Sequence, residues 1–168
     1  MIEIVEADIA RLGVDAIVNA ANSSLAGGGG VDYAVHHAAG PELAAAATAF
    51  APCPAGNAVL TPGFRLPARW VIHAVGPRWG GGLAGERETL RATYDRCFEI
   101  ARSQKEIRSI AFPAISTGAY GFPKESAAEI ALSAMRENEK YFARIVACLF
   151  VDPENVAIYR RAVERLSG

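Results

Sequence analysis

The alternation of short apolar runs with longer amphipathic segments constrains this chain more than any other feature of its sequence. Short apolar runs are typical of strands, whereas apolar residues spaced three or four apart over a longer stretch are typical of helices. Most of the apolar runs lack polar residues at alternate positions, so we expect helices to cover both faces of the sheet. The pattern therefore predicts an α/β fold in layers, formed by a single domain over residues 1–168.

The positions of the expected elements can be read from this periodicity. We expect strands at residues 2–5, 16–18, 70–75, 109–112 and 145–151, with a weaker one at 58–60. We expect helices at residues 32–49, 86–104, 124–143 and 153–166. The last helix has a clear start, because Asp152 can cap it and Pro153 falls at the first helical position, where its missing N–H costs nothing.

Charge and cysteine content argue against several classes of function. Lys plus Arg total 17 and Asp plus Glu total 18, so the net charge is −1 and nucleic acid is not favoured as the main partner. Cys53, Cys97 and Cys148 are odd in number and far apart, so we expect neither a disulfide framework nor a metal site. The start, MIEIVEAD, is acidic where a signal peptide is basic, and no apolar run reaches ~18 residues. We expect a cytoplasmic protein without a membrane segment.

Two glycine-containing loops follow predicted buried strands and precede predicted helices. The first, residues 27–30, lies within NAANSSLAGGGGVD, and the second, residues 116–123, reads STGAYGFP. Ligands of open α/β sheets bind outside the carboxyl ends of the strands, where these loops lie. Glycine lets backbone N–H groups approach a ligand closely, and a helix N-terminus adds a partial positive charge. The loops therefore predict an anion site, and two of them facing each other could hold a diphosphate.

The familiar phosphate-binding fingerprints do not match these loops. In GxGxxG the third glycine would fall on Asp32 when counted from Gly27, and on Tyr33 when counted from Gly28. No glycine is followed by lysine, which excludes GxxxxGK[ST], and neither HExxH nor GxSxG occurs. A dinucleotide-fold dehydrogenase and a Walker-type nucleotidase are therefore not supported.

Three polar residues near the first loop each allow two interpretations. Asp32 either stabilises a helix start through the helix dipole or acts beside bound phosphates as a general base or water-positioning group. Asn22 either bonds to the backbone of a turn or holds a sugar hydroxyl. His36 lies one helical turn after Asp32, so a hydrogen bond that orients one or the other is available, but a histidine bonded to a backbone carbonyl is equally ordinary.

The segments DAIVNAANSSLAGGGGVDYAVHHAAG, WVIHAVGP and FPAISTGAYGFP, in this order and at this spacing, resemble the macrodomain family and its MacroD-type hydrolase branch. The resemblance extends from Ala7 to the final helix. It implies a three-layer α/β/α domain with a mixed central sheet and a cleft that binds ADP-ribose. It also implies removal of mono-ADP-ribose from acidic side chains of modified proteins and deacetylation of O-acetyl-ADP-ribose, without a metal or cofactor.

The resemblance further implies roles for individual residues. Asp8 would accept the adenine amino group, and the backbone of Ile9 would contact the ring. Asp32 would be catalytic with a water near the phosphates, the proton going either to Asp32 or to a substrate phosphate. Asn22 would hold the distal ribose, against which Tyr120 would pack. The other implied binding residues are Ala20, Gly28, Gly29, Gly30 and Val31, then Ser116, Thr117, Gly118 and Ala119, and over the adenine either Phe150 or Val151.

The chain departs from the family pattern at two positions. Tyr33 stands where the family usually has glycine, directly after Asp32. Its ring could narrow the cleft, change how Asp32 is presented, or lie over the surface. Ala7 replaces a common glycine before Asp8, which affects only how closely that turn packs.

Two other functions remain compatible with the resemblance. The first is a reader module that binds ADP-ribose without cleaving it and therefore needs the cleft but not Asp32. The second is a regulatory macrodomain that acts through RNA or protein contacts, and the balanced charge gives it little support.

Overall fold

The computed structural model describes residues 2–150 and 152–167, and its centre is a six-stranded sheet of order β1-β6-β5-β2-β4-β3. Each neighbouring pair of strands is parallel except β3 and β4, which are antiparallel. The strands are β1 Ile2–Val5, β2 Ala16–Ala21, β3 Asn57–Pro62, β4 Trp70–Val75, β5 Ser109–Phe112 and β6 Arg144–Cys148. The predicted mixed sheet is confirmed.

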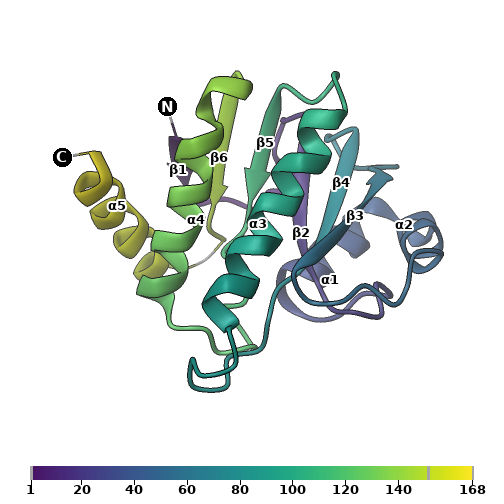
Figure 1. Cartoon of the computed structure of the whole chain (residues 1–168). Coiled ribbons are helices and arrows are strands. Elements are labelled where there is room, and N and C mark those ends of the chain that lie inside the picture. The colour runs from purple at the N-terminus through teal and green to yellow at the C-terminus, as the bar shows by residue number, and fades with distance from the viewer. Residues whose placement is uncertain (1, 151, 168) are drawn as a thin grey trace.

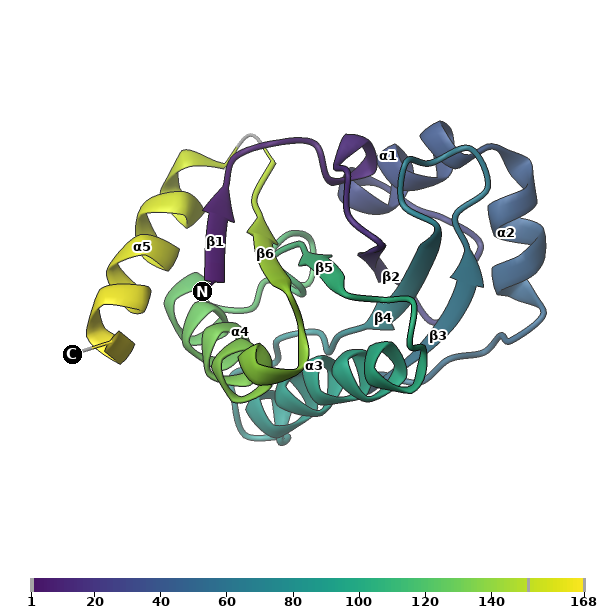
Figure 2. The ribbon, with the colours of Figure 1, turned by 90° about the horizontal axis from the view of Figure 1, so that it is seen from above.

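Helices cover both faces of this sheet (Figures 1 and 2). On one face α3 and α4 lie side by side with α5 next to α4, and on the other face lie α1 and α2. Their bounds are α1 Gly30–Ala39, α2 Pro41–Thr48, α3 Glu86–Ser103, α4 Lys124–Asn138 and α5 Pro153–Ser167, with short 3-10 helices η1 Ile9–Arg11 and η2 Glu139–Tyr141. The three-layer α/β/α architecture is therefore confirmed.

The alternation of side chains along β2 shows why the strands are apolar on both faces. Ala16 and Val18 belong to the core cluster that contains the buried residues of α3 and α4, whereas Ile17 belongs to the cluster beneath α1 and α2. Successive side chains of a strand point to opposite faces, and here each face is covered by helices. This explains why the apolar runs of the sequence show no polar alternation.

The prediction of one helix over residues 32–49 is wrong. The segment forms two helices, because α1 ends at Ala39 and α2 begins at Pro41. Gly40 between them has φ +91° and ψ 174°, a positive φ with an extended ψ that only glycine adopts readily and that interrupts the helix, and proline favours the first position of the next one. Helix α1 also begins at Gly30, two residues earlier than predicted.

Other predicted bounds differ where tertiary contacts decide them. The strand predicted at 16–18 continues to Ala21, because Asn19 is buried with its amide hydrogen-bonded and does not end the strand. The strand predicted at 145–151 ends at Cys148, opposite the end of β1 at Val5, and Val151 lies outside the described residues.

Side-chain hydrogen bonds lie at the C-terminal end of α4 and at the N-terminal end of α5. The helix predicted at 124–143 ends at Asn138, whose side chain donates to the carbonyl of Ala134 at 2.9 Å, and η2 follows. The predicted cap of α5 is confirmed, because Asn155 N donates to Asp152 Oδ1 at 3.0 Å. The short helix η1 was not predicted from the periodicity.

Substitution of Gly40 tests the break between α1 and α2. Gly40→Ala forces a Cβ into a positive-φ conformation that is essentially restricted to glycine and should lower the free energy of unfolding by about 1–3 kcal/mol, as measured by urea denaturation. Gly13→Ala is the matched control, because an added Cβ there meets no atom within 4 Å and no positive φ is required. Equal effects of the two substitutions would contradict this explanation.

Candidate active site

A cleft of about 440 Å³ opens where β2, β4 and β5 end. Residues of both predicted loops line it, so the fold brings the two loops to one site. The parallel strands all end at this edge, which is the lower edge in Figure 1. The predicted residues that line the cleft are Ala20, Asn22, Gly28, Gly29, Gly30, Val31, Asp32, Ser116, Gly118, Ala119 and Tyr120.

The first loop passes close to two polar side chains. A Cβ added to Gly28 would lie 3.1 Å from Asp32 Oδ2 and 3.3 Å from Asn22 Nδ2, so this close approach favours glycine. Asn22 also shapes the loop, because its Nδ2 donates to the carbonyl of Gly27 at 3.2 Å and its Oδ1 accepts from Ser24 N at 3.1 Å. Asn22 therefore bonds to the turn backbone and also lines the cleft.

Asp32 lies in the first turn of α1 with its side chain buried. Its Oδ1 accepts from Asn19 Nδ2 at 2.8 Å and lies 3.3 Å from His36 Nε2. Neither contact uses Oδ2, which lies on the side of Gly28. Burial raises the pKa of the Asp32 carboxyl, and the Asn19 hydrogen bond and the charge of His36 oppose this effect. A carboxylate with one oxygen held and a raised pKa has the properties of a general base.

The second loop has a strained backbone at its first residue. Ser116 has φ +69°, a conformation that non-glycine residues rarely adopt and that concentrates at ligand sites. The turn is held by a hydrogen bond of 2.9 Å from Phe122 N to the Ser116 carbonyl. Ser116 Oγ is buried and has no hydrogen-bond partner among the described residues. The hydroxyl is therefore an unsatisfied donor, which lies against Gly76 at the wall of the cleft.

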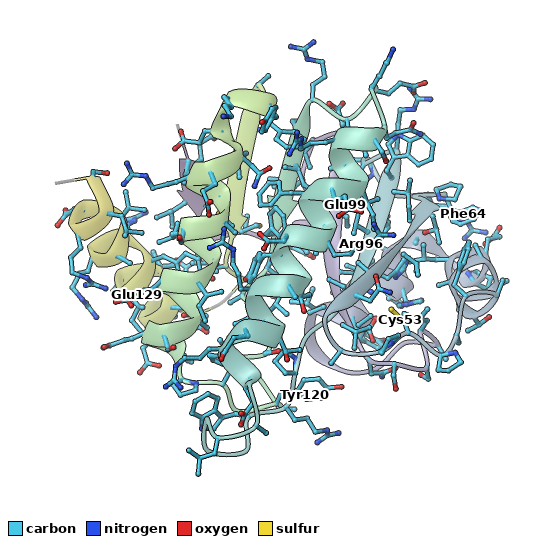
Figure 3. The ribbon with its side chains drawn as sticks, viewed as in Figure 1. Cys53, Phe64, Arg96, Glu99, Tyr120 and Glu129 are labelled. Atoms are coloured by element: carbon cyan, nitrogen blue, oxygen red, sulfur yellow. The ribbon has the colours of Figure 1, made fainter. Side chains whose placement is uncertain are left out.

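The same cleft is also lined by Gly76 and Arg78, which were not predicted from the sequence. A Cβ at Gly76 would lie 2.2 Å from Ser116 Oγ, so a larger residue would displace the second loop. The guanidinium carbon of Arg78 lies 4.6 Å from the centre of the Tyr120 ring, and Trp79 N donates to the Tyr120 carbonyl at 2.8 Å. Figure 3 shows Tyr120 below the first turn of α3. The place of Gly76 and Arg78 in the sequence could have identified them, because Gly76 directly follows β4, at the same edge of the sheet as the two predicted loops. The other missed lining residues are Ala21, Ala114 and Ile115.

Four of the predicted ligand-binding residues do not line the cleft, nor does His36, which was predicted only to orient Asp32. Asp8 caps η1 by accepting from Ala10 N at 3.0 Å, and Ile9 is buried. Phe150 is 49% exposed and follows β6, the neighbour of β1, so it lies at the same edge of the sheet as Asp8. Thr117 points toward α5, because its hydroxyl accepts from Asn155 Nδ2 at 3.4 Å.

The ring of Tyr33 lies over the surface of α1 and does not line the cleft. Its side chain is 60% exposed and stacks on His37, with 5.5 Å between the ring centres and 12° between the planes. Adjacent residues of a helix point about 100° apart, so Asp32 can face inward while Tyr33 faces outward.

The described part of the chain contains neither a candidate metal-binding cluster nor a candidate membrane-spanning helix. Residues 2–150 and 152–167 contain no group of three His, Cys, Asp or Glu side chains that could hold a metal ion. Among the same residues, no helix combines the length and apolarity that crossing a membrane requires. Cys53, Cys97 and Cys148 are buried and free.

The chain matches a known protein family over most of its length. The Macro domain model matches residues 18–131. A Macro domain-containing protein of Ralstonia nicotianae is 52% identical over 157 residues, which cover 94% of this chain and 91% of that protein. An O-acetyl-ADP-ribose deacetylase of Klebsiella pneumoniae is 50% identical over 165 residues, which cover 95% and 94%.

Solved structures agree with this assignment. A mutant macrodomain of Oceanobacillus iheyensis solved with ADPR has a TM-score of 0.91 and 38% identity, covering 99% of this chain and 93% of that one. A Trypanosoma brucei macrodomain in complex with ADP-ribose has a TM-score of 0.88 and 35% identity, covering 96% and 68%. With the family model matching most of its length, this chain belongs to the macrodomain family.

Proposed function

We propose that this protein is a hydrolase that binds ADP-ribose, removes mono-ADP-ribose from ester-linked acidic side chains of proteins and deacetylates O-acetyl-ADP-ribose. The observation that carries the proposal is the buried carboxylate of Asp32, whose Oδ2 lies beside Gly28 in a cleft that the Ser116 loop also lines. Further support comes from the relative named O-acetyl-ADP-ribose deacetylase and from the related macrodomains solved with ADP-ribose.

The diphosphate of ADP-ribose would bind between the two loops. The backbone N–H groups at the start of α1 have no side-chain cap and would donate to the diphosphate, and the helix dipole adds a partial positive charge there. Added Cβ atoms at Gly29 and Gly118 would meet no atom within 4 Å, so the backbone there is open to a ligand. The hydroxyl of Ser116 would supply a further donor from the opposite loop.

The two ends of the ligand would then reach different residues. Adenine would extend toward Asp8 and Phe150, which follow the neighbouring strands β1 and β6. The distal ribose would lie near Asn22 and Tyr120, which line the same cleft as Asp32. This orientation brings the ester at the distal ribose toward the carboxylate.

Hydrolysis of the ester adds the elements of one water molecule. The water oxygen bonds to the acyl carbon, and the ribose oxygen leaves with a proton, which yields ADP-ribose and a free carboxylic acid. Asp32 Oδ2 would orient or deprotonate the water, while Oδ1 stays bonded to Asn19 and close to His36. Holding the diphosphate and the ribose presents the ester in one geometry, which lowers the entropy cost of the reaction.

The proposed activity is tested with two substrates, a protein mono-ADP-ribosylated on glutamate and O-acetyl-ADP-ribose. Wild-type protein should release ADP-ribose from both. Asp32→Ala should reduce turnover by about a hundredfold or more, because the base is lost, and should keep ADP-ribose affinity by calorimetry. Asp95→Ala, at an exposed ion pair on α3, is the matched control. Binding without any turnover by wild-type protein would identify a reader module, and full turnover by Asp32→Ala would assign the proton transfer to another group.

The pH dependence of turnover should reflect the raised pKa of Asp32. The carboxylate must be ionised to act as a base, and a raised pKa means that protonation occurs at a higher pH than usual. We therefore expect kcat/KM for O-acetyl-ADP-ribose to fall as the pH decreases, with its midpoint above about 3.9, the ordinary value for aspartate. Circular dichroism over the same pH range checks that the protein stays folded. A midpoint at or below the ordinary value would contradict this assignment.

The surface position of Tyr33 predicts a small effect on catalysis. Tyr33→Ala should change kcat/KM by less than about twofold, because the ring stacks on His37 outside the cleft. Alanine is preferred to glycine here, since glycine would weaken the first turns of α1 by about 1 kcal/mol. Steady-state kinetics on both substrates measure the effect, and a large change on either would show that the ring reaches the bound substrate.

A further inference from the structure

A chain of buried polar side chains extends from Asp32 across three strands of the sheet. It consists of Asn19 on β2, His73 on β4 and Thr61 on β3, and each of these residues is at most 2% exposed. Buried polar groups are costly unless they are hydrogen-bonded, and here each bonds to the next. The chain lies outside the lining of the cleft, and the hydrolytic mechanism proposed above uses only its first contact.

The distances define a continuous path. Asn19 Nδ2 lies 2.8 Å from Asp32 Oδ1 and 3.4 Å from His73 Nδ1. His73 Nε2 lies 2.9 Å from Thr61 Oγ1, and the Thr61 hydroxyl donates to the carbonyl of Pro62 at 3.1 Å. Asn19 and His73 are also paired directly in the register of β2 and β4, so the sheet holds them opposite each other.

The charge of Asp32 determines the direction of every bond in this path. A carboxylate only accepts, so Asn19 must turn its NH₂ group toward Asp32. The second hydrogen of that group then points at His73 Nδ1, which must be unprotonated. His73 Nε2 consequently carries the proton and donates to Thr61 Oγ1, and the Thr61 hydroxyl donates to Pro62. The opposite orientation of Asn19 would bring two oxygens to 2.8 Å.

Two observations agree with this direction. Burial lowers the pKa of His73 to about 4, so the ring is neutral at neutral pH and has one free acceptor. Asn19 Oδ1 is buried without a hydrogen-bond partner among the described residues. An amide that leaves its oxygen unpaired in order to present its NH₂ group to Asp32 and His73 costs stability, which favours a role in the site.

We propose that Asn19, His73 and Thr61 are positioning residues for the hydrolysis, which hold Asp32 Oδ1 so that Oδ2 faces the cleft. The proposal rests on the hydrolase function proposed above. The bonds support one another in this direction: Thr61 accepts from His73 Nε2, Nδ1 then accepts from the Asn19 amide, and the amide holds the carboxylate. Thr61 thereby influences the Asp32 carboxylate through three successive hydrogen bonds, without contact with the ligand.

Thr61→Val is the decisive variant, because it keeps the shape of the side chain and removes the hydroxyl. His73 Nε2–H then has no acceptor, so the tautomer with the proton on Nδ1 is favoured. In that tautomer Nδ1–H and the Asn19 NH₂ group are two donors that face each other, and the hydrogen bond between them is lost. We expect kcat to fall about tenfold, with KM and the ADP-ribose affinity unchanged. Thr61→Ser keeps the hydroxyl and should restore the wild-type kcat.

Nuclear magnetic resonance gives a readout that does not depend on activity. The ¹⁵N shifts of His73 should show a proton on Nε2 in wild-type protein and on Nδ1 in Thr61→Val. Titration of the Asp32 carboxyl by its ¹³C shift should give a higher pKa in Thr61→Val, because the Asn19 hydrogen bond that lowers it is weakened. Loss of the Thr61 hydroxyl removes the acceptor of His73 Nε2–H whatever the role of the chain, so the tautomer reports only the first step. A purely structural role would leave the titration of Asp32 unchanged.

Three results would overturn the proposal: a wild-type kcat in Thr61→Val, a parallel loss of kcat and ADP-ribose affinity, or a wild-type His73 that carries its proton on Nδ1. The last result needs only wild-type protein, so it applies even where a variant does not fold. Absence of hydrolysis by wild-type protein would refute the proposed function, whereas equal rates of wild-type protein and Thr61→Val would refute the positioning role alone.

Discussion

The hydrogen bond from Asn19 to Asp32 is the contact on which the candidate site depends. It joins the central strand β2 to the first turn of α1, and it places a buried carboxylate at the edge of the cleft. Without this bond the carboxylate would be buried with less compensation, which is costly for a charged group. The strand also carries Asn22 just beyond its end, so β2 positions two of the polar groups to which we assign the reaction.

Close backbone approach governs the rest of the cleft. Gly28 lies against the Asp32 and Asn22 side chains, and Gly76 lies against Ser116, so the two loops can meet around a narrow space. The loop after β4 also supports the second loop, through the contact of Arg78 with the Tyr120 ring. The proposed diphosphate site is therefore built from three strand ends, and each loop depends on the position of another.

Much of the fold follows from local pattern, and the misses have definite causes. Each predicted strand is present, because apolar runs signal burial directly. The second half of β2 was not predicted, because Asn19 is polar and its burial depends on hydrogen-bond partners distant in sequence. The alanine-rich segment after Asp32 concealed a helix break, because the positive-φ conformation of Gly40 is not visible in the periodicity. Tyr33 had three open interpretations, and only the orientation of α1 decided among them.

The sequence by itself determined the layered α/β class, the two glycine-containing loops and the family. Each of these is recorded in contiguous residues: an apolar run indicates a buried strand, glycines indicate a loop, and the motif segments indicate the family. Only the tertiary structure decided that Gly76 and Arg78 belong to the cleft, that Thr117 turns toward α5, and that His73 and Thr61 stand behind Asp32. These relations join residues far apart along the chain. They exist because strand order and register place particular side chains opposite one another, and no local pattern records that pairing.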